Sequence, residues 1–144
     1  MNHYSNDTKD IKFHHRMPAQ IRFSDVDKFG HVNNSVYFSL YDMCKTQYFY
    51  DVVGKEALDN IGIVVANVET NFYSPIFYPD DITIQTAIIR IGTKSFTLLQ
   101  QAVSSKTGEV KCECKTVMVA YNTKENHSVA LPEEYKQKIL AYEE

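Results

Sequence analysis

Two aspartates and several other polar residues follow one another early in the chain, in the order Arg22-Phe23-Ser24-Asp25-Val26-Asp27-Lys28-Phe29-Gly30-His31-Val32-Asn33-Asn34-Ser35. A carboxylate can act as a general base or a nucleophile, and the unpaired N–H groups at a helix start can bind an oxyanion. Gly30 would let the backbone approach a substrate closely. These groups suffice for acyl transfer, although residue types alone equally favour an Asp-x-Asp motif that caps a helix and forms a turn.

The residues before this motif predict a strand. Ile21 and Phe23 alternate with polar residues, which is typical of a short strand over residues 18–23. Residues 1–16 have no apolar periodicity, so we expect a loose N-terminal arm.

The residues after the motif predict a long helix. Apolar side chains recur at helical spacing at positions 36, 37, 40, 41, 44 and 48. Asn33, Asn34 and Ser35 are all suitable N-caps, and Gly54 is a suitable end. Because apolar residues extend far around this helix, we expect other elements to enclose it.

From Ile61 onward the period becomes that of extended chain. We expect strands over residues 63–73, from residue 82 with a bulge at residues 88–89, over residues 95–104 and from residue 110. The strand from residue 110 should have one face exposed to solvent, with Lys111, Glu113 and Lys115 on that face. Pro132 should open a short C-terminal helix. Consecutive strands joined by short turns pair antiparallel, so we expect one α+β domain over residues 1–144.

Composition limits the class of protein. The chain has 144 residues, a net charge of −3 and three cysteines. No apolar run approaches the roughly 18 residues of a membrane span, and no basic block favours nucleic acid. The polar first residues and the odd cysteine count indicate a cytoplasmic protein with reduced thiols. Ten Tyr and eight Phe crowd toward residues 37–78, which fits either an aromatic core or a shared interface.

The motif resembles the signature of hot-dog-fold acyl-CoA thioesterases of the 4-hydroxybenzoyl-CoA thioesterase-like family, where aromatic-x-Asp-x-Asp precedes Gly-x-Val and the central helix. Residues 31–34, His-Val-Asn-Asn, are similar to a motif of the long-chain and acyl-ACP branches. The likeness continues through Tyr73-Ser74-Pro75, residues 78–81 and residues 90–95, so it covers residues 18–121. Asp80 stands where the family commonly has Gly, and Val26 where it often has a small polar residue, which leaves the branch open.

The resemblance implies a hot-dog fold, an antiparallel sheet wrapped around a long central helix. It also implies hydrolysis of an acyl-CoA to a free acid and CoA, with no metal and no cofactor. In it Asp27 is the catalytic carboxylate, as nucleophile or general base, and Asp25 is a supporting acid. The backbone N–H near Asn34 would hold the oxyanion. Residues Gly30, His31 and Tyr37 would line the substrate site, and Tyr37 equally suits a core aromatic.

The resemblance further implies a homodimer or homotetramer with sites at the subunit interface. A partner strand around Asn67 to Thr70 would face Asp27, and Arg90 and Lys94 would meet the CoA phosphates. His31 lacks a Ser or Cys in the context that a catalytic triad needs, so we interpret it as a polar lining residue. Cys112 and Cys114 lack a second ligand pair, and strand alternation explains their spacing better than metal binding does.

Other functions remain possible from the sequence. A non-catalytic acyl-CoA-binding hot-dog module would not require Asp27, and an acyl-ACP thioesterase would differ only in the thiol carrier. The dehydratase branch of this fold places its histidine elsewhere. The acyl group stays open, because its pocket depends on packing between subunits.

Overall fold

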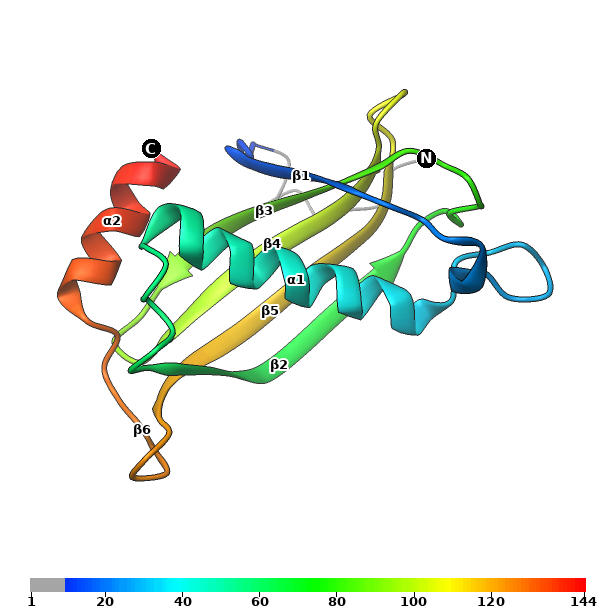
Figure 1. The fold of residues 1–144 in the computed structure, drawn as a ribbon. Helices are drawn as coiled ribbons and strands as arrows, with labels where there is room; N and C mark the ends of the chain where they lie inside the picture. The colour runs from blue at the N-terminus through cyan, green and yellow to red at the C-terminus, as the bar shows by residue number, and fades with distance from the viewer. Residues whose placement is uncertain (1–9) are drawn as a thin grey trace.

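The computed structural model describes residues 10–144, so residues 1–9 of the expected arm lie outside the described part. Its elements are shown in Figure 1, and in chain order they are β1 (His15–Ala19), the 3-10 helix η2 (Phe23–Asp25), α1 (Asn34–Val52), β2 (Gly62–Phe72), β3 (Ile82–Ile91), β4 (Ser95–Ser104), β5 (Val110–Asn122), β6 (His127–Ser128) and α2 (Glu133–Glu143).

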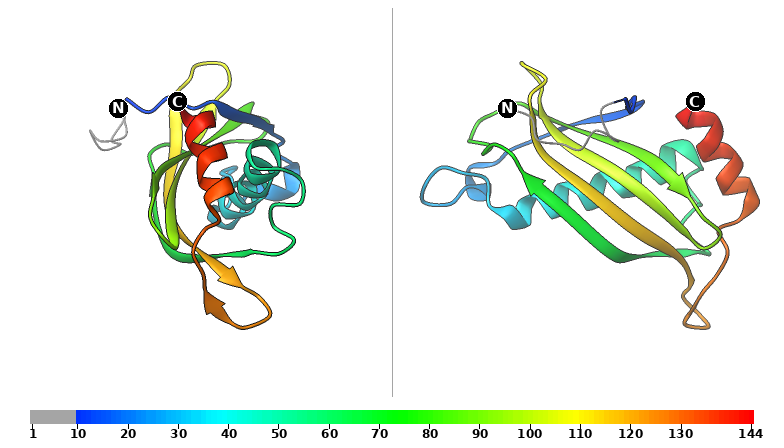
Figure 2. Two further views of the ribbon diagram at one scale, coloured as in Figure 1. Left: turned by 90° about the vertical axis from the view of Figure 1, so that its left-hand side faces the viewer. Right: turned by 180° about the vertical axis from the view of Figure 1, so that it is seen from behind.

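The strands form one antiparallel sheet in the order β1-β3-β4-β5-β2, with β6 paired to β5. The sheet curves around α1, and α2 closes one end (Figure 2). This is the expected hot-dog arrangement of a sheet around a long helix. Consecutive strands pair from β3 through β6, but β2 and β3 do not pair, because residues 73–81 cross the end of the sheet and leave β2 beside β5.

Helix α1 begins and ends as its sequence predicts. Asn33 is the N-cap, and its side-chain oxygen accepts a hydrogen bond from the Ser35 backbone N–H at 3.2 Å. Tyr37, Tyr41 and Tyr48, which lie on one helix face, are buried against the sheet.

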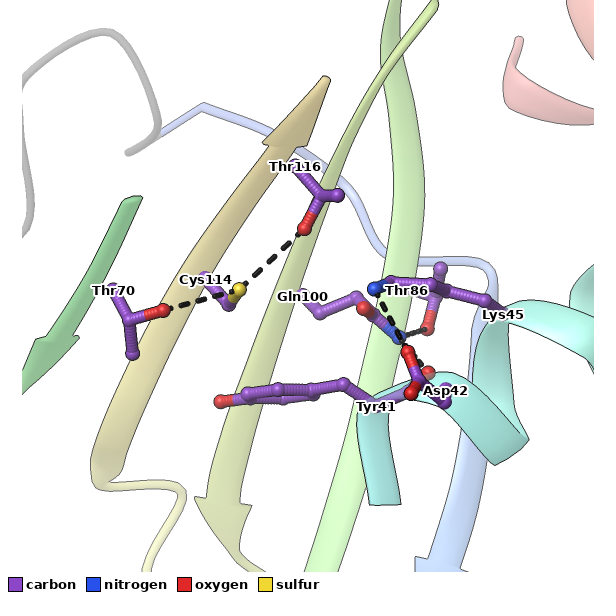
Figure 3. A network of polar contacts seen from close by, with 8 residues as sticks. All are labelled: Tyr41, Asp42, Lys45, Thr70, Thr86, Gln100, Cys114 and Thr116. Atoms are coloured by element: carbon purple, nitrogen blue, oxygen red, sulfur yellow. Dashed lines mark hydrogen bonds and ion pairs between the residues drawn. The ribbon is translucent and has the colours of Figure 1, made fainter. Parts of the chain in front are cut away.

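A buried glutamine fixes α1 to the sheet, as Figure 3 shows. The Gln100 side-chain amide donates to the Tyr41 carbonyl at 3.0 Å and to the Thr86 hydroxyl at 3.1 Å. These bonds join α1, β4 and β3 at one point inside the core. Because buried polar groups need partners, this bond pair also constrains how far α1 can slide along the sheet.

The first strand differs from the prediction. It covers residues 15–19 rather than 18–23, so residues 15 and 16 belong to the sheet and not to a loose arm. His15 is buried and its ring contacts Asp51 of α1 at 2.9 Å. Ile21 is buried but Phe23 is 78% exposed, because the chain turns into η2 at this point.

The outer face of β5 also differs from the prediction. Glu113 is buried rather than solvated, and its carboxylate accepts a hydrogen bond from the Gln101 amide at 2.7 Å. The Gln101 oxygen in turn accepts from Gln85 at 2.8 Å. These three residues form a polar ladder across β3, β4 and β5. The predicted bulge in β3 is confirmed between Ile88 and Arg90.

One side of α1 is not enclosed within the chain. Helix α1 packs on β3 and β1, while no residue of β2 is buried. On this side Phe38 of α1 is 39% exposed and Val68 of β2 is 43% exposed, and Met43, which lies about 140° further round the helix, is 49% exposed. The apolar character of the helix therefore exceeds what this chain alone covers. Among residues 10–144, no helix has the length and apolar character needed to cross a membrane.

Replacing Asn33 by Ala should lower the free energy of unfolding by about 1 kcal/mol, because it removes the cap of the Ser35 N–H. Urea unfolding at neutral pH measures this loss. Ser39→Ala, on the exposed part of α1, is the matched control and should change stability little. Equal stability of Asn33→Ala and the wild type would contradict the capping role.

Candidate active site

The turn between η2 and α1 is organised by Asp25. Its buried carboxylate accepts hydrogen bonds from the Arg22 backbone N–H at 2.7 Å and from the Arg22 guanidinium at 3.2 Å. Its backbone carbonyl accepts from the Asn33 N–H at 2.9 Å. Burial by itself would raise the pKa of Asp25, but the bonds and charge of Arg22 outweigh it and lower the pKa below 3.8. Asp25 therefore stabilises the turn as an ionised group.

Asp27 holds the same turn with only one of its two side-chain oxygens. Oδ1 accepts hydrogen bonds from the backbone N–H groups of Phe29 at 2.9 Å and His31 at 3.2 Å. Within the described residues Oδ2 has no hydrogen-bond partner, and the side chain is exposed. The carboxylate is thus oriented by the backbone and has one oxygen free to react.

Gly30 closes this turn for a conformational reason. Its φ is +80°, a region that residues with a Cβ rarely adopt, and its N–H donates to the Asp27 carbonyl at 3.0 Å. A Cβ at this position would meet no atom within 4 Å. The left-handed backbone, rather than a lack of space, therefore requires glycine here.

The first N–H groups of α1 can be accounted for one by one. The Asn33 N–H donates to Asp25, the Ser35 N–H to the Asn33 side chain, and the Val36 N–H to the Asn33 carbonyl. Within the described residues this leaves the Asn34 N–H without an acceptor. Asn34 thus offers an unpaired donor at the positive end of the helix dipole.

A cavity of about 260 Å³ adjoins the Asn34 position. His31, Asn34 and Tyr37 line it on one side, and Phe72 to Pro75 line it on the other. The rings of Tyr37 and Phe72 meet edge to face, with centroids 5.2 Å apart. Burial raises the pKa of Tyr37 to about 12, so its hydroxyl stays neutral and can donate a hydrogen bond.

The structure brings some of the predicted site residues together and leaves others apart. His31, Asn34 and Tyr37 share the cavity, and Asp27 and Gly30 lie in the adjoining turn. Asn67 is exposed on β2, and the Thr70 hydroxyl bonds the Cys114 thiol at 3.3 Å, so neither lines this cavity. Their role opposite a partner's Asp27 stays a prediction.

Arg90 and Lys94 lie at the far end of the sheet, where β3 turns into β4 beside the C-terminal end of α1. They are distant from the Asn34 cavity of their own chain. Any contact with CoA bound at that cavity would have to come from another subunit, and their role stays a prediction.

Phe72 and Phe77 are site aromatics that sequence reasoning did not single out. Phe72 ends β2, and Phe77 contacts the His31 ring at 5.0 Å between centroids. Their positions depend on the path of residues 73–81, which short-range patterns do not reveal. The one available signal was the aromatic character of the segment beside Pro75.

The three cysteines are buried and unpaired with one another. Burial raises the pKa of Cys44 to about 11 and that of Cys112 to about 12, so both remain thiols at neutral pH. Among the described residues, no group of three or more His, Cys, Asp or Glu could hold a metal ion.

Comparison with known proteins identifies the family of this chain. The family described as Thioesterase-like superfamily matches residues 21–139. Long-chain acyl-CoA thioesterase FadM of Escherichia coli K12 is 25% identical over 128 residues, which cover 83% of this chain and 92% of FadM.

Solved structures share the fold. A thioesterase of Thermus thermophilus, complexed with coenzyme A and zinc, is 26% identical and superimposes with a TM-score of 0.81, covering 91% of this chain and 95% of that one. The protein SAV2348 of Staphylococcus aureus, in complex with CoA, is 16% identical with a TM-score of 0.80, covering 92% and 84%.

The chain belongs to the thioesterase-like superfamily, since the family match covers nearly all of it. It is a thioester hydrolase with a hot-dog fold.

Replacing Asp25 by Asn should lower the free energy of unfolding at pH 7 by about 1–3 kcal/mol, because an uncharged amide bonds the Arg22 groups less well. The folded-state pKa of Asp25 is lowered, so its contribution is present at neutral pH and is lost as the pH falls below 3.8 toward the folded pKa. The gap between variant and wild type should therefore shrink in acid. Urea unfolding at a series of pH values measures it.

Asp59→Asn, an exposed change outside the turn, is the control and should show no such convergence. A gap for Asp25→Asn that stays constant down to pH 3 would contradict the ionic role of Asp25.

Proposed function

We propose that this chain hydrolyses acyl-CoA thioesters, with Asp27 as the reacting carboxylate and the Asn34 N–H as the oxyanion donor. The observation that carries the proposal is a pair of unsatisfied groups, the N–H of Asn34, which lines the cavity, and Oδ2 of Asp27 in the adjoining turn. One can activate or supply a nucleophile, and the other can bind the negative charge that develops on a thioester oxygen.

The reaction follows from these two groups. Oδ2 of Asp27 takes a proton from water as the water oxygen attacks the thioester carbonyl, and the carbonyl oxygen becomes an oxyanion facing the Asn34 N–H. Collapse of this intermediate breaks the carbon–sulfur bond, and the proton held by Asp27 passes to the departing sulfur, which releases the CoA thiol and a carboxylic acid and restores the carboxylate. Direct attack by Oδ2 would pass instead through an anhydride that water then opens. A single turnover in ¹⁸O-labelled water tests the second route, because attack of water on the Asp27 carbonyl of the anhydride would place ¹⁸O in Asp27, whereas the first route never labels it.

CoA as the thiol carrier is supported by the relatives. The Thermus and Staphylococcus proteins hold coenzyme A on the same fold, and FadM is a long-chain acyl-CoA thioesterase. An acyl carrier protein is the alternative carrier, and the same activity assay with acyl-ACP distinguishes it.

We also propose that two copies join through β2. The strand is an edge, none of its residues is buried, and Val65 and Phe72 are 49% and 45% exposed. A two-fold axis near the middle of β2 would place the β2 start of one copy beside the Phe72 end of the other. It would also bring Arg90 and Lys94 of the partner subunit toward the CoA-binding end of the site, where cations would favour phosphates.

Asp27→Asn should lower kcat for acyl-CoA hydrolysis about 10²-fold or more with a similar KM, because the carboxylate acts on the reacting carbonyl. Asn keeps a side-chain oxygen for the Phe29 and His31 N–H groups, so the turn is preserved. Thiol release from acyl-CoAs of different length measures the rate.

A melting curve close to that of the wild type serves as the control for folding. Wild-type rates in Asp27→Asn would contradict the assignment and favour an acyl-CoA-binding module. No thiol release from any acyl-CoA or acyl-ACP would contradict the proposed function as a whole.

The assembly is tested by Val68→Lys. Val68 lies near the middle of β2, where it would approach its own counterpart across the two-fold axis, so like charges should repel there. Sedimentation velocity at micromolar protein should show a dimer or larger species for the wild type and a shift toward 16.6 kDa for the variant. Leu140→Lys, an exposed apolar position on α2, is the matched control. A monomeric wild type would contradict the shared interface.

A further inference from the structure

We propose that Lys45 and Asp42 bind a neutral oxygen, a hydroxyl or keto group, on the distal part of the acyl chain. The substrate class would then be long acyl-CoAs oxygenated about ten to twelve carbons from the thioester. This inference rests on the proposed function and specifies the substrate of the same site.

Lys45 is a buried lysine with few partners. Its side chain is 10% exposed, and its bond from Nζ to Oδ1 of Asp42 measures 3.2 Å. An ammonium has three donors, so within the described residues two of them lack an acceptor. Because burying an underbonded charge costs free energy, such a lysine points to a ligand that completes its bonds.

Lys45 lines a second cavity, of about 340 Å³. Apolar side chains from α1, the following loop, β2 and β5 form most of its lining, and the polar members are Asp42, Lys45 and Thr46. In Figure 3 the Lys45 and Tyr41 side chains extend from α1 toward the side of the sheet where β5 and β2 lie. The cavity therefore offers an apolar chamber with one polar corner.

This cavity and the cavity of the candidate active site both lie along the groove between α1 and β2, which we call the seam. Helix α1 and β2 run antiparallel, with Phe72 of β2 in the first cavity and Ile63 and Val65 in the second. On α1, positions 34, 38, 42, 45 and 49 share one helix face and lead from the first cavity to the second. Phe38 and Val68, between the two cavities, are exposed apolar residues on that path.

The spacing sets the length of the acyl group. Asn34 and Lys45 are 11 residues apart, which is about 16 Å along a helix axis. An extended carbon chain advances about 1.3 Å per bond, so about twelve bonds cover this distance. The Lys45 side chain leans toward the helix N-terminus, which brings its ammonium within reach of a slightly shorter chain.

The charges select a neutral oxygen. Lys45 can donate to a hydroxyl or keto oxygen, and Asp42 can accept from a hydroxyl. A carboxylate at the chain end would face the charge of Asp42 as well as that of Lys45, which offsets its attraction. A plain methyl end leaves the Lys45 donors unsatisfied.

The test compares 12-hydroxydodecanoyl-CoA and 10-hydroxydecanoyl-CoA with dodecanoyl-CoA and decanoyl-CoA. For the wild type, kcat/KM should be about tenfold or more higher for the hydroxylated member of each pair, because a hydrogen bond to a charged group contributes on that scale. Lys45→Met should reduce this preference to within about twofold, mainly through KM, and Lys45→Arg should retain part of it. Lys55→Met, an exposed lysine after α1, is the matched control.

Three results would overturn the inference. They are a wild type with no preference for the hydroxylated substrates, a Lys45→Met variant that keeps the preference, and one that loses activity equally on both substrates of a pair. Calorimetric binding of the four acyl-CoAs to Asp27→Asn, with and without Lys45→Met, gives a readout that does not need turnover. If the hydroxylated acyl-CoAs bind more tightly in this calorimetry but the wild type hydrolyses none of them, the proposed function is contradicted and the Lys45 site is supported.

Discussion

The hydrogen bond from the Asn33 N–H to the Asp25 carbonyl fixes where α1 begins relative to the turn before it. Because Asp25 is itself held by Arg22, the start of the helix, the orientation of Asp27 and the unpaired Asn34 N–H all depend on one short segment. The cost of stranding buried donors and acceptors keeps this segment in a single conformation. Asp27 and the Asn34 N–H, the two groups of the proposed mechanism, are therefore positioned by backbone bonds rather than by long, flexible side chains.

Much of this could be predicted from short-range patterns. The cap at Asn33, the end of α1 near Gly54 and the bounds of β4 follow from spacing and turn residues, because local physics determines them. The Asp25 and Asp27 roles in the turn also follow from their positions before a helix. The start of β1 did not, since His15 joins the sheet through partners in β3 and α1 that lie far away in sequence.

The parts that could not be predicted depend on which strands become neighbours. Phe72 faces Tyr37 only because β2 crosses to the β5 side of the sheet, and no local pattern specifies that crossing. The burial of Lys45 could not be predicted for the same reason. A lysine on a helix is usually solvated, and Lys45 is buried because α1 packs beside β2 and β5 at this position. Local sequence therefore defines the Asn34 end of the groove between α1 and β2, and strand topology defines the Lys45 end.

The polar ladder of Gln85, Gln101 and Glu113 has a consequence for strand alignment. The hydrophobic pattern of a half-buried sheet excludes a one-residue slip, which would turn apolar side chains to the other face, but a two-residue shift still presents side chains to the same face. The half-buried Gln85 and the buried Gln101 and Glu113 bond in series across β3, β4 and β5 and can meet in only one alignment, since any slip leaves a carboxylate or an amide without its partner. The ladder thus fixes the register of the three central strands. Hydrogen bonds on the outer side of the sheet therefore also determine which side chains lie next to one another on the side that faces α1.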